Sequence, residues 1–222
     1  MKGLENLNGI IFGSTGVLGS NIAIELARLN TNLILHGKSI EKLKDLDNEI
    51  RKIKKKSILM QADVTDQDFY KNLLKTVSSR FKKIDFLINF IGKFNGLSPL
   101  TNMSHNEWNR MIEINLTSYW RIIKELEPLI RKSGNSKIIF LTNKEISEGK
   151  AYHNIFSISK GALLSMFKTF KAENRRLGIE IHLIDIDKIN LGMTSKIRGN
   201  NTFDPSILKK TSKKILEQCF NY

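Results

Sequence analysis

The sequence predicts an α/β fold in which helices cover both faces of a doubly wound parallel sheet of about six strands. Short apolar runs alternate with longer amphipathic segments along the chain. The first apolar run is followed by a glycine-rich turn and a helical pattern, which is how a βαβ unit begins. A length of 222 residues, 41% of them hydrophobic, suits a single domain over residues 1–222 with a sizeable core.

Strands are expected at the apolar runs and helices in the gaps between them. The six expected strands span Gly9 to Phe12, Asn32 to His36, Ser57 to Ala62, Ile84 to Phe90, Lys137 to Leu141 and Ile179 to Ile186. The clearest helical patterns run over Val17 to Leu29, Ser104 to Arg131, Ile155 to Leu177 and Asp204 to Phe220. Ser39 before Glu41 marks a further helix start, and Ser104 with Glu107 forms the Ser-x-x-Glu pattern of a capping box.

Composition limits the compartment and the partners. A single cysteine, Cys219, excludes an intramolecular disulfide framework, and the first residues lack the apolar stretch of a signal peptide, so we expect a cytoplasmic protein. The formal net charge of +14 is spread over several amphipathic segments. Its densest run, Arg51 to Lys56, falls at an expected helix end, where cations suit the helix dipole, and has no interleaved aromatic residues. We therefore expect no nucleic acid as a partner, and no membrane, since no window approaches about 18 consecutive apolar residues.

In an open parallel sheet the ligand lies beyond the carboxyl ends of the strands. The loop after the first expected strand has the sequence Gly13-Ser14-Thr15-Gly16-Val17-Leu18-Gly19. Its glycines let the backbone approach a pyrophosphate closely, and the N-terminus of the following helix can hold the negative charge. The motif predicts a dinucleotide site in a Rossmann-like domain.

The end of the second expected strand indicates which dinucleotide is bound. A cofactor with a free ribose 2′-hydroxyl usually meets an acidic residue about 20 residues after the glycine motif. The chain has His36-Gly37-Lys38 there instead. Lys38 could meet a 2′-phosphate, and Ser39 could add a hydroxyl contact, so we favour NADP(H) over NAD(H).

Several ordered motifs between Asn8 and Met193 resemble those of the short-chain dehydrogenase/reductase superfamily. Phe12 to Gly19 is similar to the family's Thr-Gly-x-x-x-Gly-x-Gly, with Val17 at the middle glycine. Asp63-Val64 matches the Asp-Val pair that contacts adenine, and Asn89 and Gly92 match the first and last residues of Asn-Asn-Ala-Gly. The resemblance implies that these residues bind the cofactor of an oxidoreductase whose substrate is an unidentified small carbonyl or alcohol.

The same resemblance implies a catalytic set, part of which is altered. Asn115 takes the place of an asparagine that holds a water in a proton relay, and Lys160 that of a lysine that binds the nicotinamide ribose. The tyrosine expected four residues before this lysine is Phe156, and the usual serine position is Asn143, preceded by Thr142. Asparagine or threonine can still donate a hydrogen bond. Phenylalanine has no proton to give, and a positioned general acid is worth about 10² to 10⁴ in rate.

Two nearby residues could supply the missing proton. Residues four or seven apart lie about 40° or 20° apart around a helix, whereas eight apart, the spacing of Tyr152 and Lys160, gives about 80°. Tyr152 could therefore substitute only from a non-helical turn. Histidine titrates near neutrality, which makes His153 the second candidate.

The resemblance weakens towards the end of the chain. Ile186-Asp187 and Leu191 take the places of the family's Pro-Gly and of a threonine that contacts nicotinamide, with Thr194 nearby, and the expected lid from Lys188 to Phe203 is short and polar. Two functions remain open: an atypical NADP(H)-dependent oxidoreductase, or a catalytically silent dinucleotide-binding protein that acts as a sensor, subunit or scaffold.

Family members commonly assemble through two long helices, which here are Ser104 to Arg131 and Ile155 to Leu177. The resemblance therefore implies a homo-dimer or tetramer. The large side chains on these helices could serve the core or the interface, and the sequence leaves both open for Trp108, Trp120, Met166, Phe167 and Phe170.

Overall fold

The computed structural model describes residues 4–53, 55–185 and 205–220. Within these ranges, six strands form one parallel sheet in the order β3-β2-β1-β4-β5-β6. The strands are β1 (Asn8–Phe12), β2 (Asn32–Gly37), β3 (Ile58–Gln61), β4 (Phe86–Asn89), β5 (Ser136–Thr142) and β6 (Ile179–Asp185). The predicted α/β class and its six-stranded sheet are confirmed.

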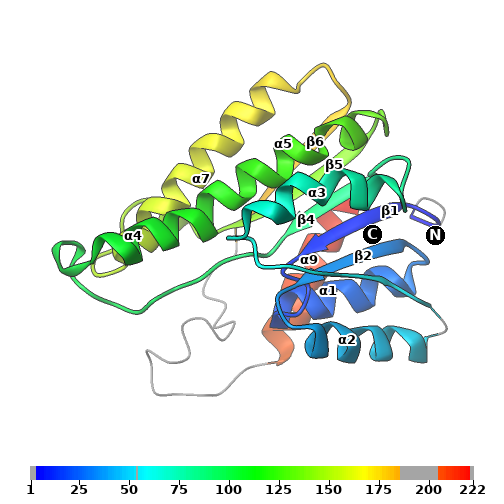
Figure 1. Cartoon of the computed structure of the whole chain (residues 1–222), viewed down its shortest axis with the longest axis horizontal. Helices are drawn as coiled ribbons and strands as arrows, with labels where there is room; N and C mark the ends of the chain where they lie inside the picture. Colours follow the sequence, from blue (N-terminus) through cyan, green and yellow to red (C-terminus); the bar gives the residue numbers. More distant parts are fainter. Residues whose placement is uncertain (1–3, 54, 186–204, 221–222) are drawn as a thin grey trace.

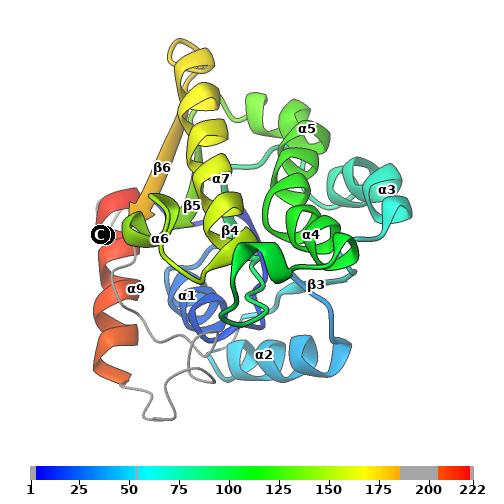
Figure 2. The same ribbon diagram turned by 90° about the vertical axis from the view of Figure 1, so that its left-hand side faces the viewer.

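Helices cover both faces of the sheet (Figures 1 and 2). One face carries α1 (Val17–Arg28), α2 (Ile40–Lys52) and α9 (Pro205–Phe220), and the other carries α3 (Gln67–Ser78), α4 (His105–Ile112), α5 (Ser118–Arg131) and α7 (Asn154–Glu173). Successive strand residues point to opposite layers, so Ile10 packs with the α3, α5 and α7 side and Ile11 with the α1 and α9 side. Both faces are buried, which explains why the strands read as continuous apolar runs.

Helix starts agree with the predicted caps. The Ser39 hydroxyl accepts a hydrogen bond from the Lys42 amide, and Ser104 and Glu107 form the predicted capping box. The helix predicted from Ser104 to Arg131 is interrupted by η2 (Glu113–Thr117), a π-helical segment between α4 and α5. The shorter elements are η1 (Leu100–Asn102) and α6 (Lys144–Ser147). In the part of the chain that the structure describes, no helix has the length and apolar character needed to cross a membrane.

Two strands are shorter than predicted because polar bonds take over at their ends. The amide and hydroxyl of Ser57 bond to the Asp47 carboxylate at 3.0 and 2.6 Å, so the third strand begins one residue later. The Ile84 amide donates to the Leu129 carbonyl at 3.0 Å, outside the ladder. With both strands shortened, their carboxyl ends still lie at the same edge of the sheet as those of the other strands.

Candidate dinucleotide site

The predicted cofactor residues follow neighbouring strands and meet at one edge of the sheet. Main-chain bonds tie their loops together: the Ser14 amide and hydroxyl donate to the His36 carbonyl at 2.9 and 3.0 Å, and the Ala62 amide donates to the Gly37 carbonyl at 3.1 Å. On the other side of β1, the Phe90 amide donates to Phe12 at 2.9 Å. The structure therefore brings the loops after β1, β2, β3 and β4 into one site.

The turn after β1 needs two of its three glycines. Gly13 has φ +69°, a conformation that side chains rarely adopt. A Cβ atom on Gly19 would lie 2.4 Å from the Gly13 carbonyl oxygen, so only glycine lets α1 pack against the turn. A Cβ atom on Gly16 would lie 3.5 Å from the same oxygen, an ordinary contact. Val17 begins α1 and is exposed, so its side chain does not fill the turn.

The N-terminus of α1 has no capping side chain. Its N-cap is Gly16, and its first turn carries no acidic residue. By contrast, Ser39, Asp66 and Ser104 cap the starts of α2, α3 and α4. The first amides of a helix need an acceptor. Those of α1 are therefore left for a bound anion such as a phosphate.

Lys38 and Asp63, both predicted to bind the cofactor, form an ion pair at 2.7 Å. The other carboxylate oxygen of Asp63 accepts bonds from the amide and hydroxyl of Thr65 at 3.0 and 2.9 Å. Partial burial opposes ionisation of Asp63, but the bonds from Lys38 and Thr65 outweigh it and lower its pKa to about 2. Ser39, predicted as a further contact, instead donates its hydroxyl to Glu41 at 2.8 Å within the cap of α2.

Asn89 and Val64, both predicted to bind the cofactor, lie at the end of β4 and in the loop after β3. The Asn89 side chain is fully buried at the end of β4. Its oxygen accepts the Ile91 amide at 2.9 Å, and its nitrogen has no hydrogen-bond partner within the described ranges. The Val64 side chain is buried, and its carbonyl accepts the Tyr70 hydroxyl at 2.7 Å. Gly92 is partly exposed in the loop after β4. These residues hold the loops that flank the site.

Lys160 lies buried in α7 between two aromatic rings. Its ammonium is 5.6 Å from the ring centre of Phe156 and 5.8 Å from that of Tyr119. Burial lowers the pKa of Lys160 to about 8. Within the described ranges, it has no ion pair or hydrogen-bond acceptor, so its N–H groups are available to a ligand.

Phe156 belongs to an apolar cluster beside this lysine. It is buried with Met111 and Ile155, and the Phe94 ring packs edge-on against it at 5.2 Å. The partly buried members are Phe94, Met103, Ile112 and Ile146. A phenylalanine in this position is therefore accommodated by its surroundings.

The two residues at the predicted serine position differ. The Asn143 side chain caps α6, where its oxygen accepts the Ile146 amide at 3.0 Å. The Thr142 hydroxyl is buried and has no hydrogen-bond partner among the described residues. Thr142 is thus the better placed of the two to bond to a ligand.

Asn115 is fully buried in η2 and spans to the loop after β4. Its side-chain oxygen accepts the Lys93 amide at 2.8 Å, and its nitrogen donates to the Lys93 carbonyl at 2.9 Å. A π-helical turn of this kind is often found at functional sites. Asn115 fixes the loop that the motif comparison assigns to the cofactor.

The two residues predicted as alternative proton donors, Tyr152 and His153, lie just before α7. Tyr152 is in a non-helical turn with φ +64°, as its spacing requires, but 63% of its surface is exposed. His153 is buried, its Nδ1 lies 3.0 Å from the Ala151 carbonyl, and its ring packs 5.7 Å from Phe94. His153 and Phe156 both pack against the Phe94 ring, whereas Tyr152 is largely exposed to solvent.

Sequence analysis missed His36, which lies directly beneath the site. Its ring packs between Phe12 and Phe69 at 5.0 and 5.4 Å, and in the part of the chain that the structure describes neither ring nitrogen has a hydrogen-bond partner. The sequence places His36 at the end of an expected strand, but the pattern does not indicate which way its side chain points. The residues assigned to the sixth loop and the lid, Ile186, Asp187, Leu191, Thr194 and Lys188 to Phe203, lie outside the described residues.

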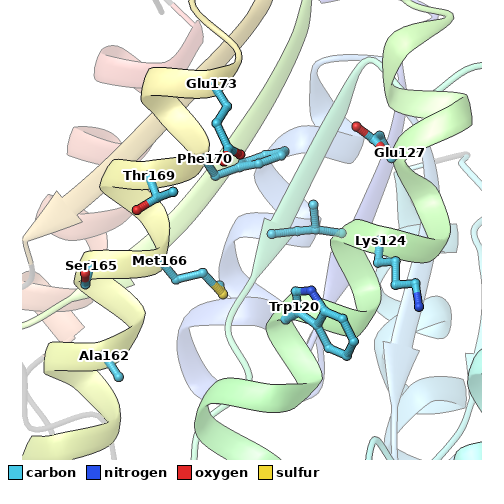
Figure 3. Close-up of a pocket in the computed structure, with 10 residues that line it drawn as sticks. Trp120, Lys124, Glu127, Ala162, Ser165, Met166, Thr169, Phe170 and Glu173 are labelled. Atoms are coloured by element: carbon cyan, nitrogen blue, oxygen red, sulfur yellow. The ribbon is translucent and has the colours of Figure 1, made fainter.

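Away from this site, α5 and α7 lie side by side and form a groove of about 650 Å³ (Figure 3). Trp120, Met166 and Phe170 line it, together with Lys124 and charged residues nearer its end. Trp120 is exposed. Of the other large side chains on these helices, Phe167 is buried in the core, whereas Trp108 is exposed on α4.

The comparisons with known proteins agree with this geometry. A family model described as short chain dehydrogenase matches residues 9–202. The 2-dehydro-3-deoxy-D-gluconate 5-dehydrogenase of Pseudoalteromonas atlantica is 26% identical, over 92% of this chain and 81% of that protein.

Solved structures share the fold at low sequence identity. A short-chain dehydrogenase-like protein from Pseudomonas syringae has a TM-score of 0.90 at 16% identity. The match covers 98% of this chain and 91% of that protein's chain. One from Shigella flexneri 2a, in complex with NADP, has a TM-score of 0.87 at 19% identity over 97% and 90% of the two chains. With its motifs at the carboxyl edge of the sheet and a family model that spans most of its length, the chain belongs to the short-chain dehydrogenase family.

Proposed function

We propose that this chain binds NADP(H) and is an oxidoreductase for a carbonyl or alcohol substrate with an atypical active site. The observation that carries the proposal is the α1 N-terminus, which lacks a capping side chain, follows a turn with Gly13 at positive φ, and packs against that turn through Gly19. The similar protein from Shigella flexneri was crystallised with NADP, which supports the choice of cofactor.

The residues present fit such a cofactor. The α1 amides would hold the pyrophosphate, Lys38 the 2′-phosphate and Asp63 the adenine. The Lys160 ammonium, buried and without an acceptor among the described residues, would hold the nicotinamide ribose. When bound, the nicotinamide would supply or accept a hydride.

The chain's own residues would do the rest of the chemistry. The Thr142 hydroxyl, buried and unpartnered, would orient the substrate oxygen. Asn115 would keep the loop at Lys93 in place. We propose that Phe156 occupies the position of the family's tyrosine, so that the proton comes from His153, Tyr152, water or the substrate.

One observation favours the second candidate, a catalytically silent dinucleotide-binding protein. Phe156 packs into an apolar cluster with Phe94 and Met111, where a proton donor would stand in the family. Cofactor binding without turnover would follow if no other group reaches the substrate oxygen. The protein would then act as a sensor, subunit or scaffold.

Titration of the purified protein with NADPH and, separately, with NADH tests the proposal before any substrate is known. We expect micromolar binding with a preference for NADPH, as measured by nicotinamide fluorescence or by the heat of binding. A folded protein that binds neither nucleotide would refute both candidate functions. Binding without any turnover of a broad carbonyl panel would favour the silent protein.

We further propose a cytoplasmic homo-dimer or tetramer, with no nucleic acid or membrane as a partner. The groove between α5 and α7 supports an assembly, because Trp120, Met166 and Phe170 present apolar surface beside Lys124. A single cysteine in the sequence agrees with a reducing compartment.

A further inference from the structure

Two residues proposed to bind the adenosine half of the cofactor, Lys38 at its 2′-phosphate and Asp63 at its adenine, hold each other in this structure. Lys38 follows β2 and Asp63 follows β3, and these strands pair in parallel with Gly37 opposite Gln61. The Ala62 amide, which donates to the Gly37 carbonyl at 3.1 Å, continues this pairing past the strand ends. The two side chains therefore emerge together, and the ammonium reaches the carboxylate at 2.7 Å.

The two partners are not held equally. Asp63 is fixed by two bonds from Thr65 to one oxygen, at 3.0 and 2.9 Å, so only the oxygen on Lys38 can change partner without disturbing the turn. Among the residues that the structure describes, Asp63 alone holds the Lys38 ammonium, and 72% of the Lys38 side chain is exposed. The lysine is therefore the mobile member of the pair.

The neighbouring polar groups leave Lys38 as the group suited to a phosphate. The Ser39 hydroxyl donates to Glu41 at 2.8 Å and accepts the Lys42 amide at 3.3 Å, so its proton is used within the cap of α2. The carboxylates of Glu41 and Asp63 would both repel a phosphate placed near them. A 2′-phosphate is therefore bound well only if Lys38 turns towards it.

We propose that this ion pair is exchanged when the cofactor binds: NADPH replaces the broken pair with a bond between Lys38 and its 2′-phosphate, and NADH does not replace it. This inference rests on the proposed function. The adenine amino group takes the Asp63 oxygen that holds Lys38, and the released ammonium binds the 2′-phosphate. With NADH the same oxygen is taken but Lys38 gains no new partner, so Lys38 hinders NADH binding and promotes NADPH binding.

Opposite effects of one substitution on the two nucleotides test this exchange. In Lys38→Met, NADPH should bind at least about ten-fold more weakly, because a charge-assisted bond to phosphate is lost. NADH should bind about two- to five-fold more tightly, because an exposed ion pair worth about that factor no longer has to be broken. Both are measured by titration calorimetry, without any turnover.

Lys71→Met is the control, since the Lys71 side chain is as exposed as that of Lys38 and pairs with Asp68 on α3 at the same distance, 2.7 Å. It should leave both affinities unchanged. Unchanged or weaker NADH binding by Lys38→Met overturns the exchange, because Lys38 would then not compete for Asp63.

Asp63→Asn provides a second arm as a background for the first substitution. Its single side-chain oxygen stays with the Thr65 amide and hydroxyl, so its NH2 group cannot pair with Lys38. Adding Lys38→Met to Asp63→Asn should then bring no gain in NADH affinity. A gain as large as in the wild-type background would mean that Asp63 is not the partner that Lys38 gives up, and the exchange would be wrong. Failure of the proposed function looks different: the folded wild-type protein would bind neither nucleotide.

Discussion

His36 is a basic side chain buried without a partner between Phe12 and Phe69. Desolvation lowers its pKa from 6.5 to about 4. The nearby Ala62 backbone and the charge of the Asp63 carboxylate raise the pKa, but they offset the desolvation only in part. The ring is therefore neutral at physiological pH and packs as an aromatic residue. Its carbonyl holds the glycine turn through Ser14, so its packing supports the nucleotide site.

We expect His36 to make the protein sensitive to acid. Above pH 6.5 its contribution to stability is fully present. As the pH falls from 6.5 towards about 4, the unfolded chain takes up the proton first, and the free energy of unfolding falls by up to about 3 kcal/mol. Urea unfolding of the wild type and of His36→Leu at pH 7.5 and 5 measures this. An equal loss of stability in both proteins would assign the effect to other groups.

Phe156→Tyr tests whether the site lacks only a proton donor. If it does, the reductase rate on a responsive carbonyl should rise by about 10² or more, within the range of a positioned general acid. NADPH oxidation across a carbonyl panel is the measurement. Phe94→Tyr, in the ring packed against Phe156, is the control and should give no gain. An inactive Phe156→Tyr that still binds NADPH would point to the silent protein.

At the scale of elements, α1 and the turn before it depend on glycine unequally. Gly19→Ala would place a methyl group 2.4 Å from the Gly13 carbonyl oxygen, whereas Gly16→Ala meets the same oxygen at 3.5 Å. We expect Gly19→Ala to lose about 1–3 kcal/mol of stability and to bind NADPH more weakly. Gly16→Ala should lose less, about 0.5–1 kcal/mol, because glycine is preferred to alanine at the N-cap of a helix. Thermal unfolding and titration of both variants check this, and similar losses in both would contradict it.

The elements also show what the sequence could and could not predict. Buried parallel strands give unbroken apolar runs, so their positions were predictable, and Ser104 with Glu107 gave the start of α4. The π-helical turn at Asn115 was not, because it depends on a contact with Lys93 in a distant loop. The Lys38–Asp63 pair likewise depends on the register of β2 and β3, which neither segment encodes alone.

At the scale of the whole molecule, the groove between α5 and α7 is the surface that we expect to join copies of the chain. Trp120→Glu would place a charge among Met166 and Phe170. We expect it to convert the assembly to monomers in light scattering coupled to size exclusion. Leu177→Glu, at an exposed apolar residue past the end of α7, should leave the mass unchanged. A wild-type monomer would refute the assembly.

The bridge between Asn115 and Lys93 has a consequence for local unfolding. The Lys93 amide lies in a loop, where backbone hydrogens usually exchange quickly with solvent, yet it is bonded to a fully buried side chain in the middle of the long helix. Its deuterium uptake should therefore be as slow as that of the α5 amides and slower than that of the neighbouring loop amides. This one amide would report how often the loop beside the nucleotide site separates from the helix.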